Sequence, residues 1–201
     1  MFGMEGNRVF GRKILVTAAA TPFGRAVALC LAARGADVLA IDVDRARLDD
    51  LAWDSAGSVA TRLGDAASPG DAFEIAAWLR SDHVNLSGLI ACPAPLGKSL
   101  SAELAPRLAR LLRANVGPFA VLVTGPSTDR SAAAESLAPF RARAVPTIHA
   151  LAPEDRTQAD SSRMAARLLD GLDRGRSTLR LSGRSRASSR PFLRAFSRAE
   201  I

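Results

Sequence analysis

Short apolar runs and helix-like segments alternate along almost the whole chain of 201 residues. The runs with the length and apolar character of buried strands are 13–18, 36–43, 58–65, 86–93, 118–125, 144–153 and 177–183. The segments with helical spacing of apolar residues are 24–35, 44–53, 68–81, 101–115, 130–140 and 160–172. Strands joined by crossover helices form a parallel sheet that is covered on both faces. The sequence therefore predicts an α/β fold, with a doubly wound parallel sheet of about seven strands in three α/β/α layers.

Residues at the ends of these segments agree with the assignment. Gly35 is placed to end the first helix, and Asp44 is placed to cap the start of the second. Pro69 stands near the start of the third helix, where proline is tolerated. Pro106 falls inside the fourth helical segment, and we expect it to interrupt that helix.

Length and composition limit the class of protein. With 48% hydrophobic residues, the chain has enough apolar side chains for one domain with a sizeable core. Cys30 and Cys92 give no disulfide framework, and His83 and His149 are too isolated to form a zinc motif. The first 13 residues lack the apolar core of a signal peptide, and no apolar run approaches the roughly 18 residues of a membrane span. These features predict a cytoplasmic protein without a metal site.

The net charge of +7 is concentrated at the end of the chain. From residue 174 onward there are eight arginines and one acidic residue, Glu200. Subtracting these from the chain's 27 basic and 20 acidic residues leaves 19 of each in the first 173. The high isoelectric point therefore does not mark the main domain as a nucleic-acid binder. We divide the chain into a domain over 1–183 and a basic tail over 184–201.

The tail has arginines spaced by four with apolar residues between them: Arg186, Arg190, Arg194 and Arg198 around Phe192, Leu193 and Phe196. As a helix, this segment would present an apolar patch flanked by arginines. Such a peptide fits an acidic partner protein, an anionic membrane surface or RNA. A disordered, solvated tail is the alternative.

Six landmarks in the right order resemble the short-chain dehydrogenase/reductase (SDR) superfamily, over roughly residues 10–183. They are TAAATPFG (17–24) in place of TGxxxGxG, Asp42 and Asp65 at the ends of the second and third strands, ACPAP (91–95), ANVGPF (114–119) and SLAPFRARAVPTIHALAP (136–153). The resemblance implies a Rossmann-like fold that binds NAD(P) and an oxidoreductase-like architecture.

The cofactor-binding residues that the resemblance implies are Ala18, Thr21, Phe23, Gly24, Asp42, Asp65, Ala66 and Cys92. Two glycines of the motif are replaced, by Ala18 and by Pro22, which has no N–H donor. The loop is thus either a weakened site for NAD or a vestigial turn. Asp42 would favour NAD over NADP, or it caps its strand, and Asp65 would meet the adenine or shape a turn. Cys92 would line the cofactor cleft or serve as a small buried hydrophobe.

The catalytic residues that the resemblance implies are largely missing. The family relay uses Asn, Ser, Tyr and Lys, but this chain contains no tyrosine, and Lys13 and Lys98 lie in the wrong regions. Asn115 and Ser127 are weak catalytic candidates, and their alternatives are a helix C-cap and a turn residue. We interpret the chain as a degenerate SDR-like protein, an accessory, structural or regulatory subunit rather than an enzyme. The alternatives are an oxidoreductase with atypical or partner-supplied catalytic residues, and a binding module that acts through the arginine tail.

The subunit interface that the resemblance implies is also altered. In typical members of the family, two long helices that flank the fifth strand pack against their copies in a neighbouring subunit. Here they correspond to 101–115 and 130–140, which are short, yet they carry apolar residues that need cover. We therefore expect a hetero-complex that is held through the flank 101–140 and the C-terminal tail.

Overall fold

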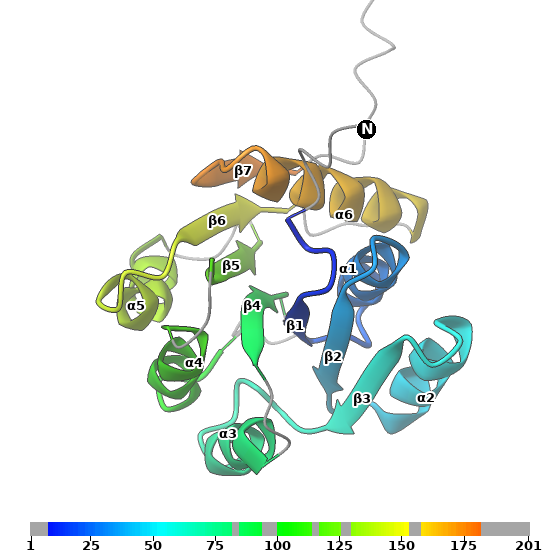
Figure 1. The fold of residues 1–201 in the computed structure, drawn as a ribbon, viewed down its shortest axis with the longest axis horizontal. Helices are drawn as coiled ribbons and strands as arrows, with labels where there is room; N and C mark the ends of the chain where they lie inside the picture. Colours follow the sequence, from blue (N-terminus) through cyan, green and yellow to red (C-terminus); the bar gives the residue numbers. More distant parts are fainter. Residues whose placement is uncertain are drawn as a thin grey trace, which may run out of the picture.

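The computed structural model describes residues 8–81, 85–93, 100–113, 117–125, 130–152 and 158–181. They form a seven-stranded sheet whose successive strands are connected along the chain by helices (Figure 1). The strands are β1 (Lys13–Thr17), β2 (Asp37–Asp42), β3 (Val59–Leu63), β4 (Leu86–Ala91), β5 (Phe119–Thr124), β6 (Thr147–Leu151) and β7 (Thr178–Arg180). The helices are α1 (Pro22–Ala33), α2 (Arg45–Asp54), α3 (Ala72–Ser81), α4 (Leu104–Arg113), α5 (Arg130–Arg141) and α6 (Gln158–Asp173). Each predicted strand and helix is confirmed, with bounds that differ by a few residues.

The strands pair in parallel in the order β3-β2-β1-β4-β5-β6-β7. The chain builds outward from β1 to β3 and then returns to place β4 on the other side of β1. The order of the strands therefore reverses between β1 and β4, which is where open α/β sheets form a crevice at the carboxyl ends of their strands. This topology confirms the predicted doubly wound sheet.

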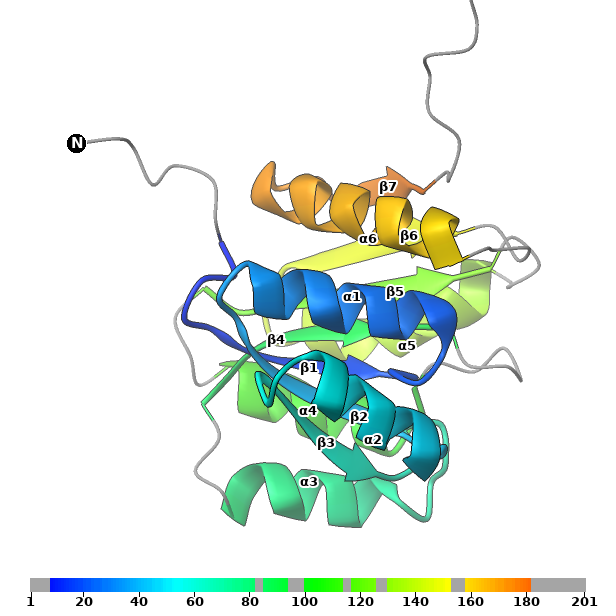
Figure 2. The ribbon, with the colours of Figure 1, turned by 90° about the vertical axis from the view of Figure 1, so that its right-hand side faces the viewer.

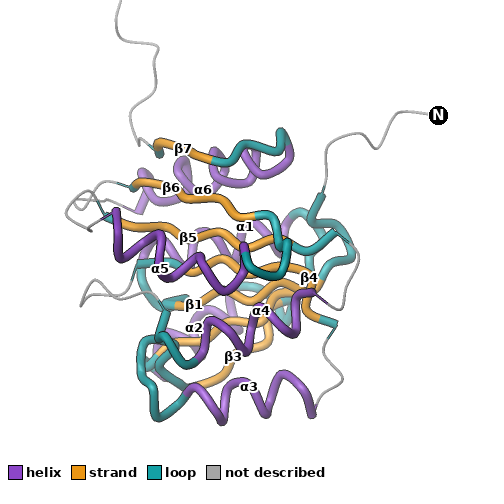
Figure 3. Tube along the Cα trace, turned by 90° about the vertical axis from the view of Figure 1, so that its left-hand side faces the viewer, coloured by secondary structure: helices purple, strands orange, loops and turns teal. Residues whose placement is uncertain are grey.

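Helices cover both faces of the sheet in three layers. Helices α1, α2 and α6 lie on one face, and α3, α4 and α5 lie on the other (Figures 2 and 3). Strand β1 shows why its sequence is continuously apolar: Ile14 and Val16 face the first layer, and Leu15 faces the second. All three side chains are fully buried, as expected for a central strand of a parallel sheet.

Capping residues set where α1 and α2 begin. Helix α1 begins at Pro22, two residues before the predicted start, because Thr21 caps it: the Thr21 hydroxyl accepts from the Gly24 N–H at 3.1 Å. Pro22 then occupies the first turn, where a missing N–H costs nothing. The predicted cap of α2 is confirmed, since the Asp44 carboxylate accepts from the Arg47 N–H at 3.1 Å.

The prediction that Pro106 interrupts its helix is wrong. Helix α4 begins at Leu104, so Pro106 lies in its first turn. The first four N–H groups of a helix have no partner within the helix, so a proline there removes no hydrogen bond. A second proline, Pro139, lies in the last turn of α5.

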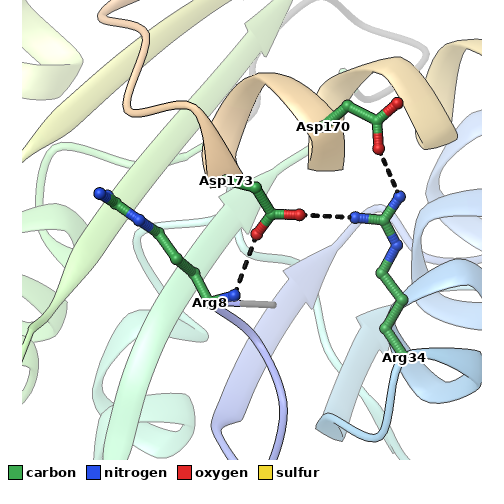
Figure 4. A network of polar contacts seen from close by, with 4 residues as sticks. All are labelled: Arg8, Arg34, Asp170 and Asp173. Carbon is green, nitrogen blue, oxygen red and sulfur yellow. Dashed lines mark hydrogen bonds and ion pairs between the residues drawn. The ribbon is translucent and has the colours of Figure 1, made fainter. Parts of the chain in front are cut away.

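The amino-terminal edge of the sheet is held by a small network of ion pairs (Figure 4). The Arg34 guanidinium, just after α1, contacts Asp170 at 2.7 Å and Asp173 at 2.9 Å, both on α6. Asp173 also accepts from the backbone N–H of Arg8 at 3.0 Å. The network thereby joins the turn before β1 and the ends of α1 and α6.

Candidate functional site

The loop between β1 and α1 keeps the shape of a dinucleotide turn without its glycines. Ala18 stands where the motif has its first glycine, and it adopts the left-handed backbone conformation with φ of 50°. Only glycine adopts this conformation without strain. At Gly24, a Cβ atom would lie 2.1 Å from the Ala18 carbonyl oxygen. The turn therefore requires glycine at position 24, because only a residue without a side chain allows the helix to pack this closely against the loop.

Several backbone donors of this loop are used within the chain. The N–H groups of Ala19, Thr21 and Arg25 donate to the carbonyl oxygens of Ile41, Ala18 and Thr21 at 3.1, 3.2 and 2.9 Å. The Gly24 N–H donates to the Thr21 hydroxyl, which itself donates to the Ala18 carbonyl at 2.7 Å. The loop therefore has the backbone path of a pyrophosphate site, but these N–H groups are not available to a pyrophosphate.

Asp42, at the carboxyl end of β2, binds the loop from the other side. Its Oδ2 accepts from the Ala20 N–H at 2.9 Å, and its Oδ1 accepts from the Val43 and Asp44 N–H groups at 2.7 and 3.1 Å. Three backbone donors thus occupy most of the acceptor capacity of this carboxylate. Of its two predicted roles, the structure shows the cap at the strand end.

The other predicted cofactor residues lie at the same edge of the sheet. Asp65 shapes a turn: its Oδ1 accepts from the Ala67 N–H at 2.8 Å, and its own N–H donates to Asp71 at 2.8 Å. Ala66 is buried, and its carbonyl accepts from Ser101 at 2.8 Å. Cys92, directly after β4, is fully buried in the core. Phe23 is buried in the same core, at 1% exposure.

These contacts decide how well the residues fit a dinucleotide. The loop, Asp42 and Asp65 follow the carboxyl ends of the neighbouring strands β1, β2 and β3. Asp42 contacts the loop, and several N–H groups of the loop are engaged in intramolecular hydrogen bonds. In this conformation, the N–H groups of Ala19, Ala20, Thr21 and Gly24 are therefore not free to bind the pyrophosphate of NAD. We derive no chemical step that uses it.

The catalytic candidates give no assembled relay. Asn115 and Ser127 lie outside the described residues. Lys13 pairs with Asp37 at 3.4 Å, at the amino end of β1 and thus at the far edge of the sheet from the loop.

The structure adds a polar pair that the sequence did not reveal. The Thr124 hydroxyl, at the end of β5, lies 2.9 Å from His149 Nε2 on β6. Thr124 is 4% exposed, and the His149 side chain is half-buried. The two residues are 25 positions apart, so only the pairing of β5 with β6 reveals the contact.

A cavity of about 570 Å³ lies beside the loop, over α1 and α2. Ala20 and Pro22 line one end, and the ion pair between Arg25 and Asp54 lies in its wall. Trp53 also lines it and is 86% exposed. Neither Asp42 nor Asp65 is among its lining residues, so this cavity is not the predicted dinucleotide cleft.

The apolar residues of the flank are covered by the chain itself. Leu104, Leu108, Leu112, Leu137 and Phe140 are each at most 3% exposed, in the core between the sheet and helices α3, α4 and α5. The chain itself therefore covers these residues, and contact of the flank 101–140 with a partner stays a prediction. The basic tail, 184–201, lies outside the described residues.

Three further features bear on the chemistry of the described residues. Burial raises the pKa of the Cys30 thiol, and the positive charge of Arg34 lowers it by less. Within the described ranges, no three His, Cys, Asp or Glu side chains are grouped to hold a metal ion. No helix in this part of the chain is long and apolar enough to cross a membrane.

Comparison with known proteins identifies the fold. No protein-family model and no curated protein matches the sequence. A hydroxysteroid dehydrogenase from Escherichia coli is similar in structure, with a TM-score of 0.67, 13% identity, and coverage of 88% of this chain and 97% of that one. A bulky-bulky ketone specific alcohol dehydrogenase from Comamonas testosteroni has a TM-score of 0.64 and 17% identity, over 84% of this chain and 85% of that one.

A third solved structure, an NADPH-dependent reductase involved in bacilysin biosynthesis, has a TM-score of 0.63 and 14% identity. The match covers 87% of this chain and 100% of that one. At such identities, the similarity shows a shared fold. The chain has the fold of the short-chain dehydrogenase/reductase structures, as its motifs predicted.

Proposed function

We propose that this chain is a catalytically degenerate protein with the SDR fold, which acts as an accessory, structural or regulatory subunit of a larger complex. The observation that carries the proposal is the state of the loop between β1 and α1. Its N–H groups and the Asp42 carboxylate bind one another and the neighbouring strand, where a working site would present them to a cofactor.

The missing acid–base groups support the same conclusion. The chain has no tyrosine, and Lys13 is paired at the opposite edge of the sheet. A positioned proton donor typically contributes about 10²–10⁴-fold to such a reaction. A chain without this donor, and with a self-bonded loop, keeps the scaffold of the fold without its chemistry.

The test of this proposal is turnover by the isolated chain. We expect no measurable hydride transfer with NAD(H) or NADP(H) across ordinary ketones and alcohols, followed by absorbance of the reduced nicotinamide. Robust turnover that is lost in Asn115→Ala or Ser127→Ala, and kept in the exposed control Arg110→Ala, would contradict it.

Binding of the cofactor is a separate measurement. Residual binding, if present, favours NADH over NADPH, because Asp42 would face the 2′-phosphate of NADPH. Calorimetry that shows tighter binding of NADPH would reject this role for Asp42. Absence of heat with either dinucleotide agrees with the self-bonded loop.

We propose that a partner protein is bound through the tail, with Phe192, Leu193 and Phe196 in contact with it and the arginines around them near its acidic groups. The pattern of the tail and the short helices α4 and α5, of 10 and 12 residues, support this assignment. Deletion of residues 184–201 should release the partner and leave the domain folded. A homotetramer that is unchanged by the deletion, with no co-purifying protein, would contradict it.

A further inference from the structure

A second cavity, of about 490 Å³, opens at the amino-terminal edge of the sheet, the opposite edge from Asp42. Four turns contribute to its wall: those that precede β1, β5 and β6, and the turn between α6 and β7. Phe119, Ile148 and Leu172, each at most 6% exposed, give it an apolar floor. We call it the amino-edge cavity. Its volume lies within the range of about 300–1,000 Å³ that is typical of small-molecule sites.

Three arginines line this cavity and form no ion pair with another described residue. Arg8, Arg12 and Arg176 are all lining residues, and none of them takes part in the ion pairs found among the described residues. Arg8 and Arg12 come from the segment before β1, and Arg176 comes from the turn between α6 and β7, far from them in the sequence. Like charges that line one cavity repel one another, and an anion bound in the cavity would reduce this repulsion.

The acidic residues nearby are already paired. Arg34 forms ion pairs with both Asp170 and Asp173, as the close-up shows (Figure 4). Arg8 gives Asp173 only its backbone N–H, and its side chain extends away from both aspartates. Counted over the described residues, the ion pairs of this edge therefore leave the cavity with an excess of positive charge.

Glycines in two turns lie beside two of the guanidinium groups, and at one of them, Gly117, a side chain would crowd the guanidinium. Gly117 has φ of +63°, and a Cβ atom there would lie 3.1 and 3.2 Å from the two terminal nitrogens of Arg12. Arg12 Nη1 donates to the Gly117 carbonyl at 2.6 Å, which anchors the guanidinium and leaves other N–H groups to donate. Gly175 has φ of +65°, and a Cβ atom there would lie 3.6 Å from the Arg8 guanidinium.

Helix capping does not account for these arginines. Cations are favoured near the carboxyl end of a helix, and α6 ends at this edge. However, the carbonyls of Asp170, Gly171 and Leu172 already accept from backbone N–H groups of the following turn, at 3.2, 3.2 and 3.0 Å. Arg34 also lies beside this end of α6 and supplies a cation there.

We propose that the amino-edge cavity binds a small organic phosphate, with the phosphate group held by Arg8, Arg12 and Arg176 and the carbon skeleton on the apolar floor. Guanidinium groups match phosphate oxygens in pairs of parallel hydrogen bonds. The floor of Phe119 and Ile148 offers a surface to carbon atoms that a free inorganic ion would not use. This site is independent of the dinucleotide loop.

The test uses the full-length chain and phenyl phosphate as the probe, which joins a phosphate to an apolar ring. Calorimetry should show saturable binding, tighter than that of inorganic phosphate. Arg8→Gln and Arg176→Gln should each weaken it by about tenfold or more, because each removes charge-assisted hydrogen bonds. Gly117→Ala should also weaken it, because its Cβ would displace Arg12.

Two controls separate this site from general positive charge. Arg110→Gln on α4 and Arg190→Gln in the tail make the same change of charge elsewhere, and each should leave the affinity within about twofold. Backbone amide NMR shifts should move at 117, 119 and 175–177. Absence of saturable binding, an equal loss in the controls, or shifts confined to the loop 18–24 or the tail would overturn the proposal. Circular dichroism confirms that each variant is folded.

Discussion

At the carboxyl-terminal edge of the sheet, the loop N–H groups and Asp42 are hydrogen-bonded to each other and to the adjoining strand, whereas at the amino-terminal edge Arg8, Arg12 and Arg176 line a cavity without an ion-pair partner among the described residues. In this fold, ligands are expected at the first edge. Here the polar groups at the expected edge bind one another, and the arginines without an ion pair among the described residues lie at the opposite edge. A fold therefore indicates where a site is usual, and the hydrogen bonds of the particular chain decide whether it is available.

The largest effect that we expect at the carboxyl edge is from Gly24→Ala. The added Cβ would lie 2.1 Å from the Ala18 carbonyl oxygen, a backbone atom that cannot move without moving the loop. We expect a loss of about 3 kcal/mol or more in the free energy of unfolding, measured by denaturant titration. The control Gly64→Ala meets Ile75 side-chain atoms at 3.6 Å, ordinary contact, and should change little. A small effect at Gly24 would show that the loop is loose enough to open for a ligand.

The next effect tests whether the Asp42 carboxylate is structural. Asp42→Ala leaves three backbone N–H groups without their acceptor, and we expect a loss of about 2–3 kcal/mol by the same measurement. Asp44→Ala, which removes one helix cap, should cost about 1 kcal/mol. Equal effects at the two positions would mean that Asp42 is not holding the loop.

The amino-terminal edge offers a comparison between paired and unpaired arginines. Arg34→Ala breaks contacts to Asp170 and Asp173, and its side chain is 28% exposed, so we expect a loss of about 1–2 kcal/mol. Arg176→Ala should change the stability of the folded chain by less than about 0.5 kcal/mol, since Arg176 is exposed and forms no ion pair with another described residue. Comparable losses would show that Arg176 serves the fold rather than the cavity.

The smallest effect is a gain in stability. Ala18→Gly removes the strain of a left-handed alanine at φ of 50°, and we expect an increase of about 0.5–1 kcal/mol in the free energy of unfolding. Ala19→Gly is the matched control, because Ala19 is not left-handed and should be destabilised by glycine. Destabilisation by Ala18→Gly would mean that the turn differs in solution.

The sequence predicted most of the fold, because apolar periodicity, caps and turn glycines act locally. Two expectations differ from the structure. Pro106 was expected to interrupt a helix because the predicted helix began at 101, whereas a start at Leu104 puts the proline in the first turn. The apolar residues of the flank 101–140 were expected to lack cover, because periodicity shows which residues are apolar and does not show what covers them. In the structure, the sheet and the neighbouring helices cover them.

The candidate site was predicted less completely. TAAATPFG and the two aspartates were placed correctly at the carboxyl edge, because motif spacing follows the chain. Asp42 accepts from the N–H of Ala20, which is 22 positions away in the sequence. Whether the carboxylate meets a ribose or a backbone N–H depends on the geometry of both strands and the loop. The amino-edge cavity has no sequence motif, since Arg176 lies more than 100 positions from Arg8 and Arg12.

The sequence by itself determined the alternation of strands and helices, the identity of the loop and the absence of tyrosine, because each is a property of neighbouring residues or of composition. Only the tertiary structure decided which donors are used. Hydrogen bonds and ion pairs between distant residues depend on directions and distances of a few ångströms, which the parallel pairing of strands and the packing of α1 on α6 fix together.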